Sequence, residues 1–272
     1  MQKIALAHRR DGTRIGLVPT MGYLHDGHLS LIRLARREAD VVAVSLFVNP
    51  TQFAPSEDLD KYPRDFQRDE SLCRKESVDI LFCPAAADMY AADHSVYVND
   101  EKLSLGLCGA ARPGHFRGVC TVVAKLFNLV LPDVAVFGEK DAQQLRIIER
   151  MVRDLNFPIR IVRGPTVREP DGLAMSSRNV YLSAEERRQA LCLRRALDVA
   201  EARCRSGERD AKALRVALSE MIATAPLARV DYLEIVDDVS LQPVARIERP
   251  SLVALAVFVG KTRLIDNTVL RP

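Results

Sequence analysis

Two histidines three residues apart, His25 and His28, stand where a β-rich run gives way to a helical pattern. Residues 14–19 predict a strand, and the apolar spacing of residues 29–39 predicts a helix. Both imidazoles then fall on one face of the first helical turn. Because a helix N-terminus presents unpaired N–H groups and a partial positive charge, we interpret this motif as a nucleotide triphosphate site. In isolation, the pair is better explained by one histidine that caps the helix and another that is solvated. A metal site is the other interpretation, but further His or Cys ligands at zinc-like spacing are lacking.

A second group of phosphate-binding side chains lies in the motif Met175-Ser-Ser-Arg178. Two hydroxyls and a guanidinium suit phosphate, because arginine supplies a planar fork of donors. The alternative is an ordinary linker with a helix cap. The charged motif Gly138-Glu-Lys-Asp141 could likewise be only a helix start with solvated charges.

The remaining candidate side chains are amides, Gln52, Gln143 and Gln144, which would be unremarkable surface residues alone. Their positions make them candidates for ligand binding, because the clusters at residues 20–28, 49–53 and 138–144 each follow the end of a predicted strand. Ligands of parallel sheets bind beyond the carboxyl ends of the strands. We therefore expect these clusters to converge on one site.

The elements that must position these residues alternate between strands and helices, which predicts an α/β fold with a Rossmann-like parallel sheet. A weakly helical lead-in, residues 2–9, precedes them. The predicted strands are 15–18, 41–48, 78–83, 94–98, 134–137 and 159–162, and further helices are predicted at 66–76 and 119–131.

Beyond Ser177 the pattern changes to that of a smaller α+β domain. Ser183 and Glu186 form a capping-box signature ahead of a long basic helix predicted to reach Ser206. A helix at 210–224 and strands at 230–236, 252–259 and 262–270 complete the chain. We divide the sequence into domains 1–174 and 175–272.

Composition narrows the class of protein. The chain has 272 residues, of which 48% are hydrophobic and 28% charged, as is ordinary for a globular protein. A net charge of +3 gives no broad footprint for nucleic acid, and no apolar run approaches the roughly 18 residues of a membrane span. Six cysteines without a C-x-x-C pair, and no leader-like start, predict reduced thiols in a cytoplasmic protein.

Taken together, the His-x-Gly-His turn and the Met-Ser-Ser-Arg loop resemble the paired signatures of nucleotidyltransferases related to class I aminoacyl-tRNA synthetases. Other stretches narrow the resemblance to the pantoate–β-alanine ligase (pantothenate synthetase) family. The matching stretches are Val18-Pro-Thr-Met-Gly-Tyr-Leu-His-Asp-Gly-His28, Phe47-Val-Asn-Pro-Thr-Gln-Phe53, Lys61-Tyr-Pro-Arg-Asp65, Arg112-Pro-Gly-His-Phe-Arg-Gly118, Phe137-Gly-Glu-Lys-Asp-Ala-Gln-Gln144, Met175-Ser-Ser-Arg-Asn179 and Arg263-Leu-Ile-Asp-Asn267.

This resemblance implies an ATP-dependent ligase that joins pantoate to β-alanine through a pantoyl adenylate. It also implies a homodimer, a C-terminal lid and Mg²⁺ accompanying ATP, with no nucleic-acid or membrane partner. Some family members have metal ligands just after the Tyr-Pro-Arg stretch. Here that region reads Arg68-Asp-Glu-Ser-Leu72, in which Arg68 and Leu72 are not ligands, so the protein's metal ligands stay unassigned. The N-terminus is several residues shorter than is usual in the family. The sequence therefore does not determine which strand forms the edge of the sheet.

The resemblance also assigns roles to residues. His28 is the implied proton donor, assisted by His25, Lys140 and Arg178. The implied ATP-binding residues are Met21, Gly22, Tyr23, Leu24, His25, Asp26, Gly27, His28, Gly138, Glu139, Lys140, Asp141, Val167, Met175, Ser176, Ser177 and Arg178. Those implied for pantoate and β-alanine are Gln52, Gln144, Val119, Val122 and Val123.

Two alternatives remain open from the sequence. One is another adenylate-forming or cytidylyl-transferring enzyme of the same superfamily, which would not need Gln52 and Gln144. The other is a nucleotide-binding regulator without catalysis. Exchange between ATP and pyrophosphate separates the three, because only the ligase requires pantoate and the regulator shows no exchange.

Overall fold

The computed structural model describes residues 1–55 and 57–272, and the chain forms two compact units. Unit 1 comprises Met1–Lys102, Arg112–Glu139 and Gln144–Pro165. Unit 2 comprises Leu103–Ala111, Lys140–Gln143 and Thr166–Pro272. The two units are therefore interleaved in sequence.

Unit 1 is built on a five-stranded sheet in the order β3-β2-β1-β4-β5, with every neighbouring pair parallel. The strands are β1 (Ile15–Thr20), β2 (Val41–Leu46), β3 (Ile80–Phe82), β4 (Val134–Gly138) and β5 (Arg160–Gly164). The central strands are buried along nearly their whole length, as their continuous apolar sequences require. The predicted Rossmann-like sheet is thus confirmed.

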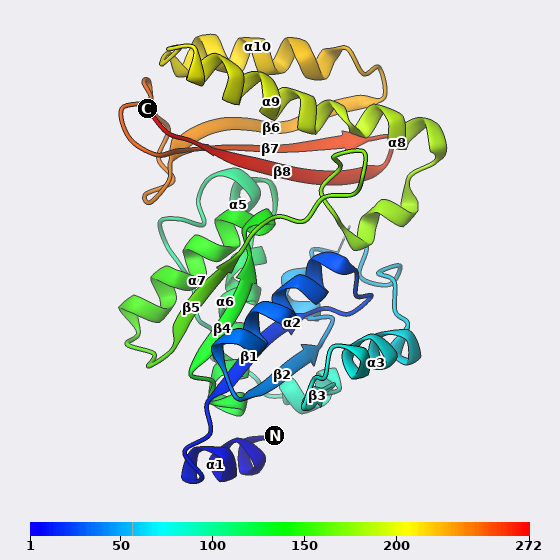
Figure 1. The fold of residues 1–272 in the computed structure, drawn as a ribbon, viewed down its shortest axis with the longest axis vertical. Helices are drawn as coiled ribbons and strands as arrows, with labels where there is room; N and C mark the ends of the chain where they lie inside the picture. The colour runs from blue at the N-terminus through cyan, green and yellow to red at the C-terminus, as the bar shows by residue number, and fades with distance from the viewer. Residues whose placement is uncertain (56) are drawn as a thin grey trace. The chain divides into compact units, whose positions relative to one another are not determined.

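Helices surround this sheet, and Figure 1 shows α2 running beside β1. Leu29, Ile32 and Ala35 of α2 pack into a core with Val18 and Val44 of the strands. The helices are α1 (Gln2–Arg10), α2 (Asp26–Glu38), α3 (Phe66–Lys75), α4 (Ala86–Met89), α6 (His115–Val130) and α7 (Ala142–Asp154), with short 3₁₀ turns η1 (Pro50–Gln52) and η2 (Glu139–Asp141).

The strand predicted at 94–98 does not form. The backbone of Val98 instead bonds to a side chain of α6, because its N–H donates to the Thr121 hydroxyl at 3.0 Å and that hydroxyl lies 3.4 Å from its carbonyl. These groups therefore have a partner other than a neighbouring strand. Helix α6 also begins earlier than predicted, at His115, after Gly114 with a left-handed φ of 83°.

Unit 2 contains a three-stranded antiparallel sheet, β6 (Ala228–Asp237), β7 (Ser251–Val259) and β8 (Thr262–Leu270), in that order. Helices α9 (Cys192–Arg205) and α10 (Ala211–Ala223) lie along it (Figure 1), and their apolar side chains form one core with the strands. The unit also contains α5 (Leu107–Ala111), η3 (Ser177–Tyr181) and α8 (Ala184–Ala190).

The capping box is confirmed, but the single long helix after it is wrong. Ser183 and Glu186 exchange the two expected side-chain bonds, at 3.2 and 2.8 Å. The helix then breaks at Leu191, whose amide bonds to the Gln189 carbonyl instead of continuing the i→i−4 ladder. Helices α8 and α9 follow one another across this turn.

The six cysteines are all unpaired in the structure. Burial raises the pKa of Cys73 and Cys192 to about 11 and that of Cys120 to about 12, so these thiols stay protonated and pack as small apolar groups. Among the residues that the structure describes, no helix is long and apolar enough to cross a membrane.

A close approach of backbones joins α6 to the loop after β2. A Cβ atom added at Gly118 would lie 2.4 Å from the Thr51 carbonyl oxygen and 2.7 Å from the Gln52 nitrogen. Only glycine allows α6 to pack this tightly against η1.

We expect Gly118→Ala to lower the free energy of unfolding by about 1–3 kcal/mol, because the overpacked methyl group must displace backbone, although alanine is the better helix former. Urea unfolding measures the change. Gly106→Ala is the matched control, since a Cβ there meets nothing within 4 Å. Equal stability of the two variants would contradict the close approach.

Candidate nucleotide and acid site

Three loops of unit 1 share one edge of the sheet. Strands β2, β1 and β4 are neighbours and run parallel, so their carboxyl ends lie together. The segments that follow them begin at Met21, Phe47 and Glu139. The sheet therefore brings together the His25 motif, the Asn-Pro-Thr-Gln loop and the end of β4.

The two histidines cap helix α2 reciprocally. His25 is the N-cap residue, and its Nδ1 accepts from the Gly27 amide at 3.2 Å, while Nδ1 of His28 accepts from the His25 amide at 3.3 Å. An accepting Nδ1 places the ring proton on Nε2. The ring centroids are 4.0 Å apart. The helix cap is compatible with the anion-site interpretation, because capping through Nδ1 puts the ring proton on Nε2.

A buried carboxylate holds the turn that leads into this helix. Asp69 of α3 accepts from the amides of Tyr23 and Leu24, at 2.7 Å each. Gly22 and Tyr23 both have left-handed φ values, 83° and 50°, and such a conformation in a tyrosine needs outside support. Burial raises the pKa of Asp69, although the amide bonds oppose the shift. Sequence reasoning missed this residue, since its targets are backbone amides.

The hydrogen bonds of Asp69 are also relevant to metal binding, because Asp69 lies in the region where some family members have metal ligands. Both of its oxygens already accept backbone N–H groups, which is a different use from metal ligation. Among residues 1–55 and 57–272, no group of three or more His, Cys, Asp or Glu side chains is placed to hold a metal ion.

Gln52 is buried at the end of η1, with its side chain held from both ends. Asn49 donates to its Oε1 at 3.0 Å, and its Nε2 lies 3.3 Å from the Met21 sulfur. Asn49 itself is 1% exposed and also donates to the Gly118 carbonyl at 3.2 Å. Gln52 is thus fixed beside Met21, the first residue predicted to contact ATP.

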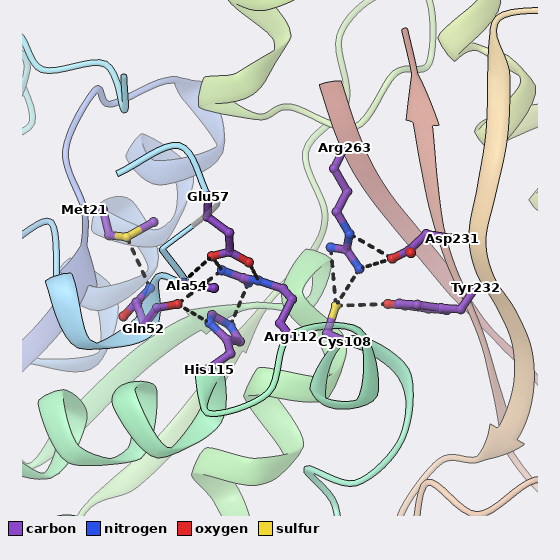
Figure 2. A network of polar contacts seen from close by, with 10 residues as sticks. All are labelled: Met21, Gln52, Ala54, Glu57, Cys108, Arg112, His115, Asp231, Tyr232 and Arg263. Carbon is purple, nitrogen blue, oxygen red and sulfur yellow. Dashed lines mark hydrogen bonds and ion pairs between the residues drawn. The ribbon is translucent and has the colours of Figure 1, made fainter. Parts of the chain in front are cut away.

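The main-chain carbonyl of Gln52 is held by two further side chains (Figure 2). It accepts from His115 Nδ1 at 2.9 Å and from Arg112 at 3.3 Å. His115 Nε2 lies 3.0 Å from a guanidinium nitrogen of Arg112, which can only donate. The ring is therefore neutral, with its proton on Nδ1.

Glu57 completes this network by accepting from Arg112 at 2.6 and 2.8 Å (Figure 2). Burial works to raise the pKa of Glu57, but the hydrogen bonds and charge of Arg112 lower it overall. The carboxylate thus stays ionised and keeps the guanidinium oriented. The sequence singled out Arg112 and His115 only as part of a matching stretch, and Glu57 not at all.

The three valines predicted to contact the acid lie on α6 and are buried. Val119, Val122 and Val123 are 2%, 6% and 4% exposed. Gln144, on α7 of the same unit, is partly exposed.

The other predicted phosphate-binding residues belong to unit 2. The Met175 amide donates to the Val167 carbonyl at 3.0 Å, which places the two predicted adenosine contacts side by side. Ser176 caps η3 by accepting from the Arg178 amide at 3.2 Å. Lys140 and Asp141 lie in the same unit.

The predicted site residues thus fall into two groups. Unit 1 contains Met21, Gly22, Tyr23, Leu24, His25, Asp26, Gly27, His28, Gln52, Val119, Val122, Val123, Gly138, Glu139 and Gln144. Unit 2 contains Lys140, Asp141, Val167, Met175, Ser176, Ser177 and Arg178.

Comparison with known proteins matches the chain over nearly its whole length. The family model of pantoate-beta-alanine ligase matches residues 1–269. Pantothenate synthetases of Thermotoga neapolitana and Moorella thermoacetica are each 57% identical, over 99% and 97% of this chain and 96% and 93% of theirs.

Solved structures agree. Pantothenate synthetase from Thermus thermophilus has a TM-score of 0.93 at 46% identity, covering 98% of both chains. Pantoate-beta-alanine ligase from Francisella tularensis, complexed with beta-gamma ATP and beta-alanine, has a TM-score of 0.81 at 34% identity, covering 98% of this chain and 95% of that one. This chain therefore belongs to the pantoate–β-alanine ligase family.

Proposed function

We propose that the chain is an ATP-dependent ligase that joins (R)-pantoate to β-alanine through a pantoyl adenylate. In the first step a carboxylate oxygen of pantoate attacks the α-phosphorus of ATP. The bond from that phosphorus to the bridging oxygen breaks, and pyrophosphate leaves. In the second step the β-alanine amine attacks the acyl carbon, AMP leaves with the former carboxylate oxygen, and the nitrogen loses a proton. The product is pantothenate.

One observation carries the adenylate step: the amide of Gln52 is fixed 3.3 Å from the Met21 sulfur, at the start of the turn that leads to His25 and His28. An acid held by Gln52 would thus stand beside a phosphate held at the start of α2. The helix N-terminus and the Nε2 protons of the two histidines would stabilise the charge that develops as pyrophosphate leaves. His28 is the residue that we assign as proton donor.

Pantoate would be bound by residues of the same unit. Amides suit pantoate because they can donate to its carboxylate and accept from its hydroxyl groups. We assign Gln52 and Gln144 to these polar groups, with Gln52 also at the β-alanine position. Val119, Val122 and Val123 form an apolar surface that suits the gem-dimethyl group.

The residues of unit 2 would complete ATP binding. Lys140 and Arg178 add positive charge for the phosphates, and Ser176 and Ser177 add hydroxyl groups. Asp141 suits a ribose hydroxyl, and the paired Val167 and Met175 suit the adenosine.

The named ligands of a relative support ATP and β-alanine as substrates, since the Francisella tularensis enzyme was solved with beta-gamma ATP and beta-alanine. Magnesium bound chiefly by the ATP phosphates, a homodimer and a cytoplasmic location stay predictions. So does the division into an ATP- and pantoate-binding domain, 1–174, and a lid, 175–272.

Pantoate-dependent exchange of radiolabelled pyrophosphate into ATP tests the adenylate step directly. We expect exchange with ATP and pantoate in the absence of β-alanine. Exchange only with another acid would favour a different adenylate-forming enzyme, and ATP binding without exchange would favour a regulator.

His28→Ala should lower the rate of pantoate-dependent exchange by about 10²–10³, because it removes one donor to the transition state. The measurement is kcat for exchange at saturating ATP and pantoate. His8→Ala, on α1, is the matched control and should keep the wild-type rate. A His28 variant that exchanges pyrophosphate at the wild-type rate would end its assignment as proton donor.

Gln52→Ala should raise the KM for pantoate by about 10- to 100-fold, because a buried hydrogen-bonding partner of the acid is lost. The KM for ATP should change far less. Steady-state kinetics with each substrate varied in turn separates the two effects. Gln67→Ala, at an exposed position on α3, is the control. An unchanged pantoate KM would argue against the role of Gln52.

A further inference from the structure

Two short segments come from the middle of the unit 1 sequence but belong to unit 2. They are Leu103–Ala111, which contains α5, and Lys140–Gln143. The second segment begins with Lys140, one of the two cations that we assign to the ATP phosphates. What attaches these segments to unit 2 therefore decides where Lys140 lies relative to the other cation, Arg178.

Lys140 is attached directly to the sheet of unit 2. The side-chain Nδ2 of Asn267 donates to the Lys140 carbonyl at 2.9 Å. Asn267 lies within β8, where it pairs with Ala254 of β7, so its backbone is fixed on the sheet. Asn267 closes the matching stretch Arg263–Asn267, to which the proposed reaction gives no role.

A second attachment lies at the other end of the segment. Gln143 is 6% exposed, and its Oε1 accepts from the Cys108 amide at 2.9 Å. Its Nε2 donates to the carbonyls of Leu103 and Gly106, at 2.8 Å each. One buried amide thus joins Lys140–Gln143 to Leu103–Ala111.

The segment Leu103–Ala111 is in turn bonded to the sheet (Figure 2). The Cys108 sulfur lies 3.2 Å from the Tyr232 hydroxyl and 3.7 Å from a guanidinium nitrogen of Arg263. Arg263 of β8 also donates to Asp231 at 2.8 and 3.0 Å. The pKa of Tyr232 is raised well above its usual value, mainly by burial and secondly by the nearby Cys108. The hydroxyl of Tyr232 therefore stays neutral.

The neighbour of Asn267 on β8 holds the other phosphate-binding loop. Asp266 accepts two hydrogen bonds from Arg168, at 2.7 and 2.9 Å, and is 3% exposed. Arg168 bridges to Ala174, directly before the loop Met175–Arg178. Adjacent residues of a strand point to opposite faces, so β8 holds one loop from each face.

We propose that Asn267 and Gln143 are positioning residues that fix Lys140 to the strand that also anchors the Met175–Arg178 loop. Two cations on separate loops thereby keep a set spacing for the phosphates of one nucleotide. The inference rests on the proposed function, because it takes Lys140 as a ligand of ATP. Neither positioning residue is assigned a contact with substrate.

The test uses the full chain and the variant Asn267→Asp, which replaces the amide donor by a carboxylate that repels the Lys140 carbonyl. We expect kcat/KM for ATP in pantoate-dependent exchange to fall by about 10- to 100-fold, as for a misplaced catalytic group, with the pantoate KM nearly unchanged. Asn267→Ala, which adds no charge, should act in the same direction. Asn99→Asp, at an exposed position, is the control and should keep wild-type activity.

A double-mutant cycle with Lys140→Ala separates positioning from general destabilisation. If Asn267 acts through Lys140, Asn267→Asp should cost about twofold or less in the Lys140→Ala background. Equal costs in both backgrounds, or wild-type activity of Asn267→Asp and Asn267→Ala, would overturn the inference while leaving the proposed function intact. Absence of pantoate-dependent exchange in the wild-type chain would overturn the proposed function and the inference together.

Discussion

The hydrogen bonds that two successive backbone amides donate to one buried carboxylate, Asp69, are the constraint on which the candidate nucleotide site depends. They hold Tyr23 in a left-handed conformation that a tyrosine rarely adopts, and so set the direction in which the chain enters α2. His25 and His28 cap the helix through Nδ1 directly after this turn. The tautomers of both rings, and hence the donors that we propose for phosphate, are thus linked to a residue of α3.

The fold was largely predictable from the sequence because its strands are buried on both faces. An uninterrupted apolar run such as 41–46 has few alternatives to a central parallel strand. The errors fall where backbone groups find unusual partners. The backbone of Val98 bonds to the hydroxyl of Thr121 and not to a neighbouring strand. At Leu191 the chain turns between two helices, although the sequence pattern of the two helices is that of a single helix. Neither interaction produces a periodic pattern of residue types in the sequence.

The sequence indicates those side chains of the candidate site that are expected to touch substrate. His28, Gln52 and Arg178 stand in short motifs whose chemistry is legible from residue type and spacing. Asp69, Arg112 and His115 were not, because they act on backbone amides or carbonyls of other loops. Every residue offers such groups, so the sequence does not indicate which of them is the target. The strand β8 was predicted, but the contacts of Asp266 and Asn267 were not, because Asn267 bonds to a backbone carbonyl and Asp266 to an arginine distant in sequence.

The interleaving of the two units has a consequence for how the chain can be divided and made. A polypeptide ending at Pro165 holds all of unit 1, but Leu103 and Leu107, buried in the full chain, would lack the sheet of unit 2. During synthesis these leucines leave the ribosome well before β6, β7 and β8 exist. Conversely, unit 2 cannot be expressed as one contiguous fragment without losing part of its own structure. The two units are thus separate in architecture but dependent on each other in folding.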